Sequence, residues 1–131
     1  MKTILIQVGK TTNKHFIAGI SDYVERINHY MPFEVVTIPE LKNTKNITEE
    51  QQKQSEGELI IKQLQPTDTV VLLDEHGVEY RSVDFARWLE QKRNTARRLV
   101  FVIGGPYGFS KDVYARANEQ VFLVVLLDSS S

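Results

Sequence analysis

Continuous hydrophobic runs alternate along the chain with segments in which apolar residues recur at helical spacing. The runs are rich in β-branched and aromatic residues, which is typical of strands buried on both faces of a parallel sheet. Five such strands are expected, at residues 2–8, 33–38, 69–74, 99–103 and 121–127. Because helical segments separate them, the pattern predicts an α/β fold with a doubly wound parallel sheet of about five strands.

Helices are expected between these strands. Apolar residues recur three and four positions apart over residues 15–30, which predicts an amphipathic helix. Thr48, with Gln51 three residues later, resembles a capping box that opens a helix running to about residue 65. Two further helices are expected, one from residue 82 and one over residues 111–118, with Ser82 and Ser110 as their caps.

Loops are expected over residues 40–50 and 75–77. The first of these segments contains few apolar side chains that could pack in a core. The glycines that follow Ile103 form the most distinctive loop. Gly104 and Gly105 carry no Cβ, so a ligand can approach the backbone closely, and open α/β sheets bind ligands at such loops. A plain turn from strand to helix is the alternative, because the spacing matches neither nucleotide-binding glycine fingerprint.

Composition limits the function classes. The length of 131 residues predicts a single domain, residues 1–131, and the net charge of −1 does not by itself indicate a polyanionic partner. The chain contains no cysteine, which excludes disulfides and thiolate metal sites, and its three histidines lack metal-ligand spacing, so no metal is expected. No run approaches the ~20 apolar residues of a membrane span, and a soluble, cytoplasmic protein is expected.

Few residues suggest a reaction on their own. His76 beside Asp74 follows a strand and could act as a general base, although a solvated turn residue is the simpler interpretation. No nucleophile motif is present in the sequence, so the catalytic residues are unknown. If the chain binds RNA, local cations must contact the phosphates, and the candidates are Lys42, Lys45, Arg97 and Arg98.

A family resemblance rests on several short motifs that occur in order over about residues 1–120. They are Val8-Gly9-Lys10, Ile38-Pro39-Glu40, Lys53 with Glu56-Gly57-Glu58, Leu73-Asp74-Glu75-His76-Gly77 and Phe101-Val102-Ile103-Gly104-Gly105-Pro106-Tyr107-Gly108. Together they resemble the bacterial ribosomal RNA large subunit methyltransferase H family.

The resemblance implies a SPOUT-class fold with a C-terminal trefoil knot and a homodimer. It also implies transfer of a methyl group from S-adenosyl-L-methionine to N3 of a pseudouridine in the large-subunit (23S) rRNA of the assembled ribosome. By the same resemblance, Leu73 and Gly104 would contact the cofactor, and Gly105 and Gly108 would shape the loop.

The last residues, 121–131, depart from the pattern of the family, which has a second cofactor loop and a final helix after this point. The knot and the cofactor site are therefore expected to be incomplete, with weak cofactor binding and doubtful activity. The apolar strand at 121–127 is expected to leave a face or an edge uncovered. A non-catalytic α/β domain that binds the ribosome or RNA is the alternative function.

Overall fold

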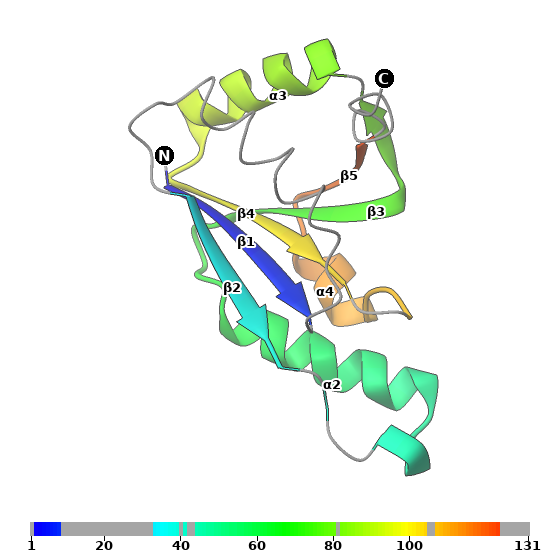
Figure 1. Cartoon of the computed structure of the whole chain (residues 1–131). Helices are drawn as coiled ribbons and strands as arrows, with labels where there is room; N and C mark the ends of the chain where they lie inside the picture. The colour runs from blue at the N-terminus through cyan, green and yellow to red at the C-terminus, as the bar shows by residue number, and fades with distance from the viewer. Residues whose placement is uncertain are drawn as a thin grey trace.

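The computed structural model describes residues 2–8, 33–39, 41, 44–80, 82–104 and 107–123. Over these ranges the chain forms a five-stranded sheet in the order β2-β1-β4-β3-β5, and every neighbouring pair is parallel (Figure 1). The α/β class and the parallel sheet predicted from the hydrophobic pattern are therefore confirmed. The expected knot and the single-domain organisation stay predictions, because they involve residues outside the described ranges.

The strands lie close to their predicted positions. Their bounds are β1 Lys2–Val8, β2 Phe33–Ile38, β3 Thr69–Tyr80, β4 Arg98–Ile103 and β5 Glu119–Leu123. The helices are η1 Thr44–Asn46, a short 3-10 turn, and α2 Glu49–Lys62, α3 Ser82–Thr95 and α4 Lys111–Arg116. The helix expected over residues 15–30 lies outside the described residues. No helix in the described ranges combines the length and the apolar character needed to cross a membrane.

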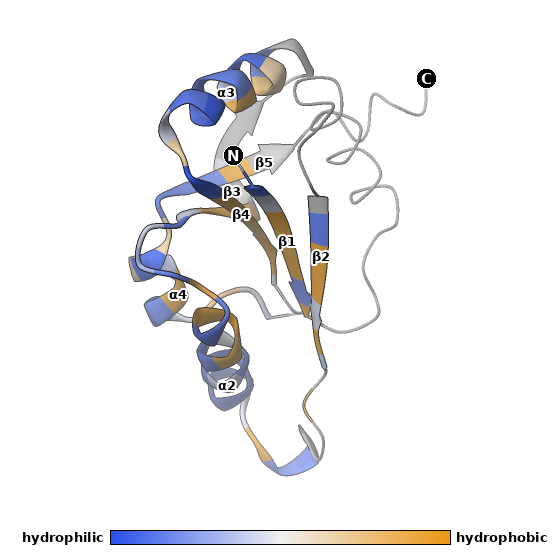
Figure 2. Cartoon of the chain, turned by 90° about the vertical axis from the view of Figure 1, so that its left-hand side faces the viewer, coloured by the Kyte–Doolittle hydropathy of each residue, from blue (hydrophilic) through white to orange (hydrophobic). Residues whose placement is uncertain are grey.

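Helices lie on both faces of the sheet. Figure 1 shows α3 above the strands and α2 and α4 below them. On the lower face, Ile60 of α2 and Val113 of α4 belong to one buried cluster with alternate residues of the strands, among them Val100 and Val102. Figure 2 shows these strands mainly in orange, with the blue, hydrophilic surface of the helices turned outward. The central strand β4 is thus a continuous apolar run because it is buried on both of its faces.

The opposite face packs around Phe101 of β4. Phe85 and Trp88 of α3 lie with ring centroids 6.2 and 6.0 Å from Phe101, and they stack on each other at 5.5 Å. Trp88 Nε1 also donates a hydrogen bond to Glu119 Oε1 at 3.1 Å, and Lys92 forms an ion pair with the same carboxylate. These contacts attach the start of β5 to α3.

The expectation of a loop at residues 75–77 is wrong, because β3 continues to Tyr80. Leu73 and Val78 both pair with Val121 of β5, so the register of the pairing shifts between them. A Cβ on Gly77 would lie 2.5 Å from Val121 N, and the absence of this atom lets the two backbones approach. The strand therefore passes the glycine instead of stopping there.

Other boundaries differ by a few residues. The capping box of α2 is confirmed, since Gln51 N donates to Thr48 Oγ1 at 3.1 Å and Thr48 N donates to Gln51 Oε1 at 3.0 Å. However, α2 ends at Lys62, and η1 lies within the expected loop at 40–50. The strand β5 begins at Glu119, two residues earlier than expected, and its residue Val121 is buried. Its outer edge pairs with no described strand, and residues 124–127 lie outside the described ranges.

Candidate functional site

Two of the predicted site residues, Leu73 and Gly104, lie close together where β4 ends, although β3 itself continues past Leu73 to Tyr80. Ile103, the last residue of β4, pairs with Leu73 of β3 on one side and with Gln7 of β1 on the other. Gly104 follows Ile103 directly, so it lies at the same edge, one position beyond Leu73. Ligands of open α/β sheets bind at this edge.

The loop after Gly104 folds back over it. A Cβ on Gly104 would lie 3.0 Å from Phe109 Cε1 and 3.3 Å from the carbonyl oxygen of Gly108. Gly108 has a φ of 85°, in the left-handed region that favours glycine. The ring of Phe109 is buried and meets Tyr114 edge to face, with centroids 5.7 Å apart. The loop is therefore closed by packing on its inner side.

The predicted cap at the end of this loop is confirmed. Ser110 Oγ accepts a hydrogen bond from Val113 N at 3.3 Å and satisfies one of the free N–H groups at the start of α4. The outer side of the loop is open, with Gly108 exposed and the Tyr107 side chain 43% exposed. Leu73 and Gly104 are half-buried. Gly105 lies outside the described residues, so its position at the site stays a prediction.

Gln7 was not among the predicted site residues, although it lies in the same row. Its Nε2 donates to Thr37 Oγ1 at 2.7 Å, its side chain is only 8% exposed, and its buried Oε1 accepts no hydrogen bond within the described part of the chain. A buried amide oxygen without a donor is costly, so this group requires an explanation. The signal in the sequence was a polar residue directly after the apolar run Ile4-Leu5-Ile6.

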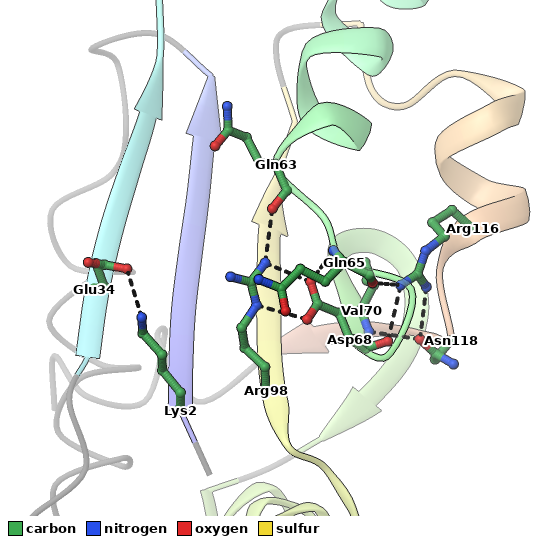
Figure 3. A network of polar contacts seen from close by, with 9 residues as sticks. All are labelled: Lys2, Glu34, Gln63, Gln65, Asp68, Val70, Arg98, Arg116 and Asn118. Atoms are coloured by element: carbon green, nitrogen blue, oxygen red, sulfur yellow. Dashed lines mark hydrogen bonds and ion pairs between the residues drawn. The ribbon is translucent and has the colours of Figure 1, made fainter.

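The opposite edge, at the amino ends of β3 and β4, carries a network of polar contacts (Figure 3). Arg98 donates to Asp68 Oδ1 through Nε at 2.8 Å and to Asp68 Oδ2 through Nη2 at 2.7 Å. The same Nη2 donates to the Gln63 carbonyl at 2.9 Å. The guanidinium of Arg98 is thus held by a buried carboxylate and its side chain is only 17% exposed, while the expected contact of Arg98 with RNA stays a prediction.

The network continues to α4 and β5. Arg116 donates to the carbonyl of Gln65 at 2.7 Å, and Asn118 exchanges hydrogen bonds with the backbone of Val70, each 2.8 Å long. These contacts connect the turn after α2 to the end of α4 and to the strand that follows (Figure 3). This edge therefore holds α2, α4, β3 and β5 together.

Of the remaining basic candidates, Arg97 lies away from the glycine loop. Arg97 is exposed but precedes β4, so the six residues of that strand place it about 20 Å from Gly104. Lys45 is exposed in η1, Lys42 lies outside the described residues, and the side chain of His76 is not among those described. Within the described ranges, no three His, Cys, Asp or Glu residues are placed to hold a metal ion.

A charge effect on a pKa is clear at Glu50, in the first turn of α2. A hydrogen bond from Lys53, whose Nζ lies 2.9 Å from Glu50 Oε1, and the positive charge of that ammonium lower the pKa of the Glu50 carboxyl. Because Glu50 is fully exposed at the surface of α2, this shift describes a surface ion pair and does not identify a general base.

Comparison with known proteins identifies the class. The family model described as predicted SPOUT methyltransferase matches residues 1–126, and the chain therefore belongs to the SPOUT methyltransferase family. Ribosomal RNA large subunit methyltransferase H of Bacteroides fragilis is 62% identical over 122 residues, which are 92% of this chain and 78% of the relative. The proteins of the same name from Phocaeicola vulgatus and Flavobacterium johnsoniae are 58% and 46% identical, covering 94% and 96% of this chain and 79% and 81% of the relatives.

Proposed function

We propose that the chain is a methyltransferase that uses S-adenosyl-L-methionine to methylate N3 of a pseudouridine in large-subunit rRNA. Membership of the SPOUT methyltransferase family supports the reaction class. The name shared by relatives that are up to 62% identical supports rRNA of the large subunit as the substrate. The pairing of Leu73 with Ile103, next to Gly104, carries the assignment of the cofactor to this edge.

The residues present fit the proposed cofactor. A Cβ on Gly108 would meet nothing within 4 Å, so the loop is open at this point and its backbone can be approached closely. Freed N–H and C=O groups of such a loop can hold adenine and ribose, while Leu73 offers an apolar wall. Gly104 and Gly108 would thus bind through the backbone, and Gly105 would shape the loop between them.

The bound cofactor supplies an electrophilic methyl group on a sulfonium. In the proposed transfer, N3 of the pseudouridine would accept this methyl group and release its proton to water, and S-adenosylhomocysteine would leave. The loop would orient the donor for this step, because a fixed geometry of the reacting atoms lowers the barrier. We also propose a homodimer, as the family resemblance implies, and a cytoplasmic location, where bacterial ribosomes are found.

The experiment uses methyl-labelled S-adenosylmethionine and ribosomes that lack the modification. We expect label in the large-subunit rRNA at N3 of one pseudouridine, and no label when the ribosomes already carry the methyl group. Transfer to another nucleotide would contradict the proposed substrate. Co-sedimentation with ribosomes without any transfer of label would contradict the reaction and support the non-catalytic alternative.

A further inference from the structure

Helix α2 packs against α4 at Gly57, in the middle of the helix. A Cβ on Gly57 would overlap Ser110 Oγ and would lie 3.1 Å from both Ser110 Cβ and Val113 Cγ2. Gly57, Ser110 and Val113 are all buried. The distance between these two helices therefore depends on the missing side chain of Gly57.

The residue that Gly57 touches ends the glycine loop. Ser110 follows Gly108 and Phe109, and its hydroxyl is held by Val113 N while its carbonyl accepts from Tyr114 N at 3.1 Å. Ser110 is thus fixed on one side by its own helix and on the other by α2. A change in its position moves the end of the loop directly.

A second contact fixes the same end of α4 to α2. Gln54 Nε2 donates to Asp112 Oδ2 at 2.8 Å, one turn of α2 before Gly57. On the other side of the loop, the ring of Phe109 fills the space next to Gly104. A continuous path of contacts therefore leads from Gly57 through Ser110 and Phe109 to the carboxyl end of β4.

We propose that Gly57 is a positioning residue of the cofactor site, acting through Ser110 and Phe109 on Gly104. Gly57 does not contact the cofactor itself. The consequence for cofactor binding rests on the proposed function, whereas the consequence for the loop does not.

Alanine at position 57 forces a rearrangement. Either the Ser110 hydroxyl turns away and releases Val113 N, or α4 moves away from α2. The first change loses the cap, and the second loses packing around Val113. In both cases the loop between Gly104 and Ser110 no longer has the same anchor.

The test compares Gly57→Ala with the natural chain. In the absence of ligand, we expect altered backbone amide chemical shifts for Gly104 and Gly108. In titrations with S-adenosylmethionine, we expect the dissociation constant of the folded protein to rise about tenfold, which corresponds to ~1.4 kcal/mol. Glu58→Ala, at the exposed next position of α2, is the matched control and should change neither quantity.

A rescue variant separates positioning from general destabilisation. Ser110→Gly removes both Ser110 atoms near Gly57, and glycine is tolerated at a helix cap at little cost. In the double variant with Gly57→Ala we expect the amide shift of Gly104 and the cofactor affinity to return toward those of Ser110→Gly alone. A merely destabilising alanine would give no such rescue.

The outcomes are distinct. Unchanged amide shifts of Gly104 and Gly108 in folded Gly57→Ala would overturn the proposal, as would a failure of the rescue. If Gly57→Ala does not fold, Ser110→Ala tests the same path, and an unchanged Gly104 amide there would overturn it. If the natural chain binds no cofactor, the proposed function fails, while the amide shifts still decide the role of Gly57.

Discussion

Neutralising Asp68 should destabilise the protein strongly, because this carboxylate is the centre of the polar network at the amino ends of β3 and β4 (Figure 3). In Asp68→Asn, one carboxylate oxygen is replaced by an NH2 group, which donates hydrogen bonds and cannot accept them. The Asp68 carboxylate accepts from Arg98 twice and from Gln65 N once, at 2.7 to 2.8 Å. The variant therefore leaves at least one donor facing another donor in a buried place.

The magnitude follows from burial. The Asp68 side chain is 0% exposed and that of Arg98 17% exposed. Breaking a buried ion pair by removing one partner costs about 3–5 kcal/mol. Arg98 keeps the carbonyl of Gln63 and some access to water, which places the expected loss near the lower end, about 3 kcal/mol. For a chain of this length that corresponds to roughly 10 °C in melting temperature.

The assay is urea unfolding monitored by circular dichroism. The free energy of unfolding is compared between variants that show the same linear dependence of this free energy on urea concentration. The matched control is Glu34→Gln, because the ion pair of Glu34 with Lys2 is 3.8 Å long and its side chains are 56% and 49% exposed. This control should cost at most about 1 kcal/mol. A loss below about 1 kcal/mol for Asp68→Asn would refute the reasoning, since the buried pair would then behave like an exposed one.

Three further outcomes are expected. Gly108→Ala should lower the free energy of unfolding by about 1–2 kcal/mol, because alanine is strained at a φ of 85° although its Cβ meets nothing; equal urea midpoints would contradict this. Trp88→Phe should cost about 1–2 kcal/mol through the lost hydrogen bond to Glu119, and a neutral result would show that Lys92 alone holds that carboxylate. Lys53→Met should raise the pKa of Glu50, measured by NMR titration, because the Lys53 ammonium lowers this pKa in the natural chain. The ion pair stabilises the folded state at pH values above the ordinary carboxyl pKa, and this stabilisation is lost as the pH falls through the lowered pKa of Glu50.

The strands and the glycine loop are predictable from the sequence because their signals are local. Runs buried on both faces, such as residues 99–103, leave few alternatives to a strand in a covered parallel sheet. The cap at Ser110 and the capping box at Thr48 each depend on a residue only three positions later, Val113 and Gln51 respectively. Because the strands are parallel, Leu73 lies beside Ile103, the residue before Gly104, and the two predicted site residues come close together.

The features that could not be predicted depend on residues distant in sequence. Arg98 looks like a surface cation until Asp68, thirty positions earlier, is placed against it. The sequence Glu75-His76-Gly77 looks like a turn because the partner that extends β3, the strand at Val121, is more than forty residues away. Gly57 belongs to a motif that carries the family resemblance, but only the packing against Ser110 shows why glycine stands there.

The central claim is that the edge formed by Leu73, Gly104 and Gly108 holds the methyl donor. The most direct measurement is a titration of the 15N-labelled chain with S-adenosylmethionine, followed residue by residue through the backbone amides, which also detects weak binding. We predict saturable shifts at Leu73, Gly104 and Gly108, with Asp68 and Arg98 at the opposite edge unchanged. Shifts confined to the opposite edge, or none up to millimolar donor, would contradict the account.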